Sequence, residues 1–80
     1  KDSEGLKVSV YPNPTYGQVN LELNNSADEL AVMDITGKTV LRKMNLGSKV
    51  SIDLTDYHSG IYVISVKFGE EVQYFKVVKK

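Results

Sequence analysis

The chain has 80 residues, with ten Lys and Arg balanced by ten Asp and Glu, one His, no Cys and 41% hydrophobic residues. A chain of this size forms one domain and buries too little surface to build both a core and a deep substrate cleft. Zero net charge with dispersed basic residues argues against nucleic acid or an anionic membrane as a partner. Without Cys, disulfides and thiolate-bound zinc or iron–sulfur sites are excluded.

The ends of the sequence suggest a larger parent protein. No apolar run is long enough for a transmembrane helix, and Lys1–Gly5 lacks the apolar core of a signal peptide. The first residue is not Met. We therefore expect residues 1–5 to be the end of a linker and residues 6–80 to form a single domain.

Residue usage points to strands. Eleven Val, four Ile and five Tyr stand against two Ala, and β-branched and aromatic side chains suit a pleated, half-buried surface. Apolar residues alternate with polar ones in four segments, which are 6–10, 19–23, 50–54 and 62–66. Turn signals recur about every 8 to 12 residues, as in a β-sandwich or barrel. The sequence predicts an all-β fold.

The first break lies at Pro12-Asn13-Pro14 and continues to Gly17. Proline cannot donate to a sheet ladder, so Pro12 and Pro14 are interpreted as strand terminators. These residues are expected to have a structural role.

The segment Asp34–Gly37 predicts the turn of a hairpin. Asp34 suits the first position of a type I turn, and Gly37 suits a left-handed bulge position after it. This turn pairs Val32 with Val40 and Asp34 with Lys38. A shorter turn at Thr36-Gly37 would pair Met33 with Val40, and the sequence leaves both registers open.

A second hairpin is predicted at Phe68–Glu71. Gly69 occupies the first central position of a two-residue type II′ turn, which requires a positive φ. The predicted register pairs Phe68 with Glu71, Val66 with Gln73, Ile64 with Phe75, and Tyr62 with Val77, all on the core side, and Ser65 with Tyr74 and Val63 with Lys76 on the other.

The stretch from Leu54 to Ile64 predicts a tyrosine corner. One strand ends at Leu54, and Tyr62 enters the next strand with a hydroxyl able to reach upstream backbone. Gly60 allows an unusual backbone conformation at this corner. Together with the strand count, the corner predicts an immunoglobulin-like antiparallel sandwich of about seven strands.

Few residues suggest a catalytic, metal-binding or cofactor-binding site. His58 and Ser59 are adjacent, so their side chains are expected to diverge, and no catalytic triad is visible. Asp53 and Asp56 could contribute to a calcium site, although their spacing is not that of an EF-hand. No glycine-rich phosphate loop precedes a helix, so no cofactor, metal or catalytic residue is predicted.

Four segments in order carry a family resemblance: Val10–Pro14 followed by Gly17, Val32–Lys38, Ser59–Val66 and Lys76–Lys80. Together they resemble the C-terminal sorting domain of the type IX (Por) secretion system of Bacteroidetes, from about Val8 to Lys80. The resemblance implies an immunoglobulin-like sandwich without chemistry of its own. It also implies export through the periplasm to the cell surface or the medium.

The same resemblance implies partners and recognition residues. The partners would be a cargo domain linked to the N-terminus, the outer-membrane translocon, and in many members a surface sortase-like peptidase that removes the domain. The recognition residues would be Gly60, Ile61, Tyr62, Lys76, Lys79 and Lys80. The structural motif residues would be Pro12, Asn13, Pro14, Gly17, Asp34, Gly37 and Gly69. Two structural explanations stay open. The corner would itself require Gly60 and Tyr62, and terminal lysines can protect an edge strand from pairing.

A second class of function is an immunoglobulin-like or fibronectin-like accessory module, serving as a spacer or binding carbohydrate. Its stacking residues would come from Tyr11, Tyr16, Tyr57 and Tyr74, although the absence of Trp weighs against it. The outer sheet face near Val63, Val72 and Tyr74 could support weak self-association. Direct insertion into a membrane is not expected.

Overall fold

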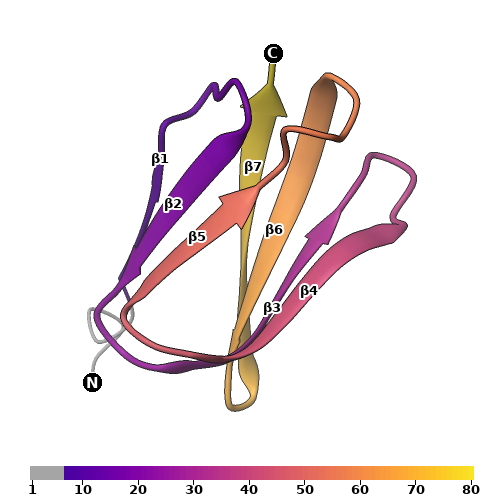
Figure 1. The fold of residues 1–80 in the computed structure, drawn as a ribbon. Coiled ribbons are helices and arrows are strands. Elements are labelled where there is room, and N and C mark those ends of the chain that lie inside the picture. The colour runs from indigo at the N-terminus through magenta and orange to yellow at the C-terminus, as the bar shows by residue number, and fades with distance from the viewer. Residues whose placement is uncertain (1–6) are drawn as a thin grey trace.

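The computed structural model describes residues 7–80 as seven strands in two facing antiparallel sheets (Figure 1). The predicted linker Lys1–Gly5 and Leu6, the first residue of the first predicted strand, lie outside the described residues. The strands are β1 (Val8–Tyr11), β2 (Gln18–Leu23), β3 (Ala27–Met33), β4 (Thr39–Leu46), β5 (Lys49–Asp53), β6 (Gly60–Phe68) and β7 (Glu71–Lys79). Nowhere in residues 7–80 does the fold contain an apolar helix of the length needed to cross a bilayer.

The strand order is β1-β2-β5 in one sheet and β4-β3-β6-β7 in the other. The chain changes sheet after β2, after β4 and after β5. Strand β3 pairs with β4 on one side and with β6 on the other. This is an immunoglobulin-like arrangement in which the fourth strand lies beside the third. The predicted all-β sandwich of about seven strands is confirmed.

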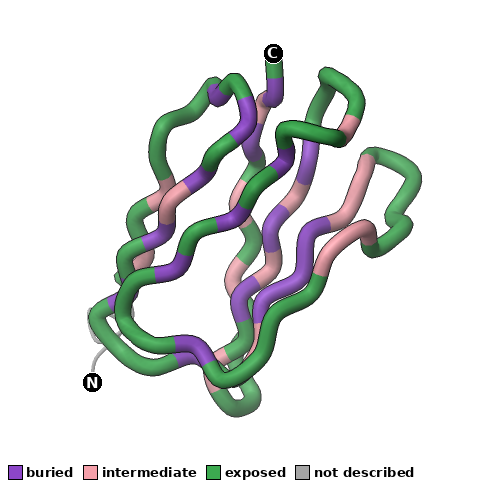
Figure 2. The backbone as a smooth tube through the Cα atoms, viewed as in Figure 1, coloured by how far each residue is buried: buried purple, intermediate pink, exposed green. Residues whose placement is uncertain are grey.

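One hydrophobic core lies between the two sheets. Along β2, β5 and β6 its members alternate with less buried residues, as purple alternates with green or pink in Figure 2. The inward positions predicted in three segments are all buried, and they are Val19, Leu21, Leu23, Val50, Ile52, Leu54, Tyr62, Ile64 and Val66. Val8 and Val10 are only half-buried, because β1 is an edge strand.

The β6–β7 hairpin has the predicted register. Phe68 lies opposite Glu71, and Tyr62 lies opposite Val77, with every intermediate pair as expected. Gly69 has a φ of 63°, the left-handed region that the predicted turn requires. The turn chemistry alone was therefore sufficient to set this register.

The β3–β4 hairpin differs from prediction by one residue. The turn is as expected, because the Gly37 N–H donates to the Asp34 carbonyl at 3.0 Å and Gly37 has a φ of 90°. Asp34 lies opposite Lys38, whose carbonyl accepts the Asp34 N–H at 2.9 Å. Val32, however, pairs with Leu41, since a bulge shifts the register between Val32 and Met33. The predicted Val32–Val40 pair is wrong because the bulge leaves one extra residue on β4.

Candidate functional site at the C-terminal end of the sandwich

The predicted tyrosine corner is present at the start of β6. The Tyr62 hydroxyl donates to the His58 carbonyl at 2.7 Å, and the Tyr62 side chain is buried. Its ring centroid lies 6.4 Å from that of Tyr57, whose own hydroxyl donates to the Val40 carbonyl at 3.0 Å. Gly60 has a φ of 149°, which L side chains rarely adopt. These contacts fix the loop between β5 and β6 against the end of the sandwich.

Lys79 connects the last strand to this loop. The residue follows Val77 on the inward side of β7 and is only 9% exposed. Its Nζ atom donates to the Tyr57 carbonyl at 2.8 Å. A buried ammonium needs such a partner, because burying it unpaired costs several kcal/mol. Lys79 therefore faces inward in the folded domain.

The outer edge of β7 is covered by residues Asn13–Thr15, which follow β1. The Asn13 side-chain amide donates to the Lys76 carbonyl at 2.8 Å and accepts the Val78 N–H at 3.1 Å. Thr15 continues the pairing, with its N–H donating to the Val78 carbonyl at 2.9 Å and its carbonyl accepting the Lys80 N–H at 2.8 Å. Figure 1 shows the loop between β1 and β2 beside the end of β7. The C-terminal strand is thus held on both sides.

Thr15 and Gly17 hold this covering segment in place. Thr15 is 1% exposed, and its Oγ1 atom donates to the Gln18 carbonyl at 2.6 Å and accepts the Gly17 N–H at 3.0 Å. A Cβ added at Gly17 would lie 2.5 Å from the Thr55 Oγ1 atom. Gly17 is therefore required by a close approach rather than by an unusual φ.

Three of the predicted recognition residues have exposed side chains at this end, and Gly60, which has no side chain, is exposed as well. Lys76 and Lys80 lie on β7 and directly after it, and Ile61 is 43% exposed opposite Val78. The Lys80 ammonium lies 6.0 Å from the ring centroid of Tyr16. Gly60, Tyr62 and Lys79 instead make or permit the internal contacts above. The recognition role of all six residues stays a prediction.

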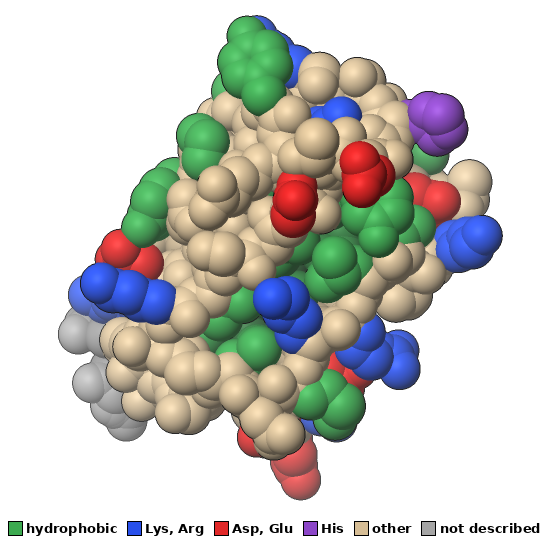
Figure 3. Space-filling view, viewed as in Figure 1, with side chains coloured by type: hydrophobic (Ala, Val, Ile, Leu, Met, Phe, Trp, Pro, Cys, Tyr) green, Lys and Arg blue, Asp and Glu red, His purple; other side chains and the backbone are tan. Residues whose placement is uncertain are grey.

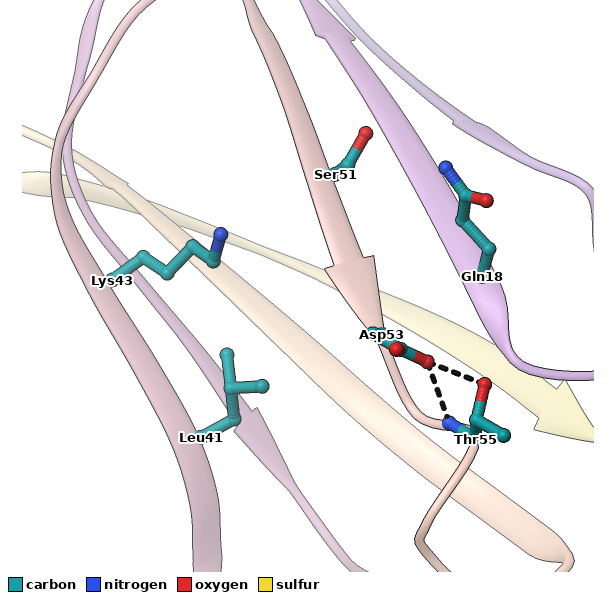
Figure 4. Close-up of a pocket in the computed structure, with 6 residues that line it drawn as sticks. All are labelled: Gln18, Leu41, Lys43, Ser51, Asp53 and Thr55. Atoms are coloured by element: carbon teal, nitrogen blue, oxygen red, sulfur yellow. Dashed lines mark hydrogen bonds between the residues drawn. The ribbon is translucent and has the colours of Figure 1, made fainter.

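Two aspartates stabilise turns with their carboxylates. A hydrogen bond from the Thr36 hydroxyl, helped by the N–H groups of Lys38 and Thr36, holds the pKa of Asp34 below its usual value, although partial desolvation opposes the shift. The Thr55 hydroxyl and N–H lower the pKa of Asp53 in the same way. Figure 4 shows the Asp53 carboxylate turned toward Thr55, in a depression of about 500 Å³ that Lys43 and Leu41 border from β4.

The residues considered for metal binding and catalysis are not assembled into a site. Residues 7–80 contain no group of three or more His, Cys, Asp or Glu that could hold a metal ion. His58, Ser59 and Asp34 border one shallow depression of about 210 Å³, but the Asp34 carboxylate is occupied by its own turn. Within the described chain, no hydrogen bond joins the His58 and Ser59 side chains.

The four tyrosines considered for sugar stacking lie in different places. Tyr11 and Tyr16 flank the loop after β1, with 42% and 79% exposure. Tyr57 packs against Tyr62 in the corner, and Tyr74 lies on the outer face of the other sheet. They do not form a single platform.

Sequence reasoning missed the pairing of Asn13 with the last strand. Its two hydrogen bonds join residues 63 and 65 positions apart, which no local pattern reveals. One chemical signal was present, since an amide side chain offers a donor and an acceptor like a peptide group. Between two prolines, which lack N–H groups, such a side chain can replace the missing ladder.

Fold and site together define a small all-β domain whose C-terminal strand is locked in place by a loop from near its N-terminus. A family model described as "Secretion system C-terminal sorting domain" matches residues 9–80. The chain therefore belongs to this family, the sorting domains of type IX secretion. Such a domain is a secretion signal that is not itself catalytic, and it connects an N-terminal cargo with the type IX machinery.

The ulvan lyase NLR42 of Nonlabens ulvanivorans is similar to this chain. The two are 35% identical over 76 residues, which are 91% of this chain and 14% of that protein. The chain thus spans a small part of the length of this relative. Family and relative together indicate export to the cell surface or the extracellular space.

Proposed function

We propose that the outer-membrane translocon of the type IX system recognises this domain in its folded form, at the end where β7 finishes. The observation that carries the proposal is the hydrogen bonding of Lys76–Lys80 to Asn13 and Thr15 on the outer edge of β7. A strand held on both sides presents fixed side chains and cannot act as a free, extended tail.

The predicted recognition residues then divide into two groups. Ile61, Lys76 and Lys80 are exposed and would contact the translocon directly. Gly60, Tyr62 and Lys79 would position them, because their contacts lie within the corner. Charged contacts at such a surface contribute mainly to specificity and to the rate of encounter.

The cargo would precede residue 1, since the family is C-terminal in its proteins. A surface sortase-like peptidase would then cut within or before the polar segment Lys1–Gly5, leaving the sandwich intact. Self-association through Val72 and Tyr74 stays a separate prediction, and both side chains are exposed on the outer face of the second sheet.

The experiment is a fusion of residues 1–80 to the C-terminus of a periplasm-directed reporter in a host with the type IX system. Cell fractionation should find the reporter at the surface or in the medium with the domain and in the periplasm without it. Equal export in both cases would contradict the sorting role of this chain.

Matched variants separate direct recognition from positioning. The double change Lys76→Ala and Lys80→Ala should reduce export while leaving the unfolding midpoint unchanged. Lys67→Ala, at an exposed lysine toward the opposite end of β6, is the control and should export normally. Lys79→Met retains the aliphatic stem but loses the hydrogen bond to the Tyr57 carbonyl. Because Lys79 is proposed to act by positioning, this variant should reduce export only in proportion to its loss of stability. Normal export of the double variant would refute the proposed surface.

A further inference from the structure

The outer face of the β1-β2-β5 sheet carries a prearranged row of polar side chains. The sheet register places Tyr11 beside Asn20, and Asn20 beside Ser51. Asn20 Oδ1 accepts hydrogen bonds from Ser51 Oγ at 3.0 Å and from Gln18 Nε2 at 3.3 Å. These bonds fix three side chains, while the Asn20 Nδ2 donors and the Gln18 Oε1 acceptor have no partner within residues 7–80.

An aromatic margin borders this polar row along β1. The Tyr11 ring is 42% exposed, and its hydroxyl donates to the Glu22 carboxylate, so the ring is held in one orientation. Beyond it, Pro12 and Tyr16 border an open depression of about 410 Å³, whose floor includes Gln18 and Asn20. Figure 3 shows a largely polar surface over β2 and β5, with hydrophobic side chains along the β1 margin and again between β5 and β4.

A flat, immobilised ring beside amide and hydroxyl groups suits a sugar. The apolar face of a pyranose can stack on the ring, and its hydroxyls can exchange hydrogen bonds with amides. Because the polar groups are already positioned by one another, binding would immobilise few further side chains.

The charges on this face select among sugars. Glu22 and Asp53 lie at its two ends, Lys49 lies opposite Glu22, and Lys43 borders the same depression as Asp53. Asp53 is ionised at neutral pH, as an ordinary aspartate is, and the Thr55 hydrogen bonds lower its pKa further. Because the two carboxylates and the two ammonium groups balance, the face has no net attraction for uronates or sulfates, whereas its amides and hydroxyls can hydrogen-bond to neutral sugar hydroxyls.

We propose that the outer face of the β1-β2-β5 sheet binds neutral oligosaccharides, with Tyr11 as the stacking residue and Gln18, Asn20 and Ser51 as hydrogen-bonding residues. This binding does not depend on sorting. The row of Tyr11, Asn20 and Ser51 lies on the other sheet from β7. The two surfaces adjoin at Tyr16, whose ring centroid lies 6.0 Å from the Lys80 ammonium. A domain with both surfaces could hold its cargo near a glycan while the type IX translocon binds the C-terminal end of β7.

The test is an NMR titration of the ¹⁵N-labelled 80-residue chain with four defined hexasaccharides. Three are neutral β-1,4-linked chains of glucose, xylose or mannose, and one is an anionic hexagalacturonate. We expect at least one neutral hexasaccharide to shift the amide signals of Tyr11, Asn20 and Ser51, with roughly tenfold or more higher affinity than hexagalacturonate.

Single-residue variants test whether the sugar binds at the outer face of the β1-β2-β5 sheet. Tyr11→Ala and Asn20→Ala should each lower the affinity roughly tenfold, whereas Tyr11→Phe, which keeps the ring, should retain most of it. Tyr74→Ala is the matched control, because Tyr74 is an exposed tyrosine on the outer face of the other sheet. Retained amide dispersion in each spectrum shows that the variant is folded.

Three results would overturn the proposal. The first is no shift with any neutral hexasaccharide at about 10 mM, where a site with a Kd near 1 mM is largely filled. The second is equal or tighter binding of hexagalacturonate. The third is undiminished binding by folded Tyr11→Ala and Asn20→Ala variants.

Discussion

The first half of β7, from Glu71 to Tyr74, pairs with β6 alone, whereas the second half pairs with β6 on one side and with Asn13–Thr15 on the other. The first half is fixed by a local device, the Gly69 turn, which sets its register with β6. The second half is fixed by contacts between segments more than 60 residues apart. The same strand is thus stabilised by local turn chemistry at one end and by tertiary pairing at the other.

This difference has a consequence for edge protection. The uncovered edge is short and is flanked by the charged residues Glu71 and Lys76, which disfavour pairing with another chain. The covered end of β7 is protected by pairing instead, so its side chains keep one arrangement.

The largest expected effect on the covered half comes from Gly17→Ala. The new Cβ would lie 2.5 Å from Thr55 Oγ1, so either the Thr55 side chain, which is hydrogen-bonded to Asp53, or the loop carrying Asn13–Thr15 must shift. We expect a loss of about 2 kcal/mol in the free energy of unfolding, as for overpacked sites. Urea denaturation measures it, and Gly47→Ala, where a Cβ meets nothing within 4 Å, is the control. Equal stability of the two variants would contradict the close approach.

Asn13→Ala tests the cover directly. It removes two hydrogen bonds to the backbone of β7 and should lower the free energy of unfolding by about 1 to 2 kcal/mol. Hydrogen exchange should accelerate for the Val78 amide, which loses its acceptor, and stay unchanged for Val77, which lies on the β6 side. Unaltered exchange at Val78 would show that Asn13 does not hold the strand.

Gly69→Ala tests the uncovered half. Alanine in the left-handed region at a φ of 63° should cost about 1 kcal/mol. Because the covered half has independent contacts, amide exchange should accelerate near Val72 and remain slow at Val78. Uniform acceleration along β7 would mean that the two halves do not differ.

The smallest effect concerns acid stability. Asp34 and Asp53 have folded-state pKa values below their usual 3.8, so each contributes stability that is present above that pH and is lost as pH falls through the folded pKa. The double variant Asp34→Asn and Asp53→Asn should therefore be less stable at pH 7 and should lose less stability on acidification. Parallel pH profiles of the midpoint in urea for variant and parent would disprove these turn contributions.

Local sequence signals predicted much of the fold correctly. Period-two alternation identified the inward residues of β2, β5 and β6, and the Gly69 turn set the β6–β7 register. Tyr62 and the loop before it predicted the corner hydrogen bond. The β3–β4 register was off by one residue, because nothing in the pattern around Val40 signals a bulge.

The candidate site was predicted as a set of residues but not as an arrangement. Lys79 and Lys80 are adjacent and chemically identical, yet one is buried against the Tyr57 carbonyl and the other is exposed beside Tyr16. The predicted core-side position of Val77 implies by alternation that Lys79 faces inward and Lys80 outward, but it does not reveal that the Tyr57 carbonyl is the partner of Lys79.

The sequence by itself determined the fold class, the inward faces and the hairpin turns, because these depend on backbone preferences and on a side-chain period of two. Only the tertiary structure decided that Asn13 and Thr15 complete the edge of β7, that Lys79 bonds to the Tyr57 carbonyl, and that Tyr11, Asn20 and Ser51 form one row. Those contacts join distant segments, and their formation depends on how two sheets pack together.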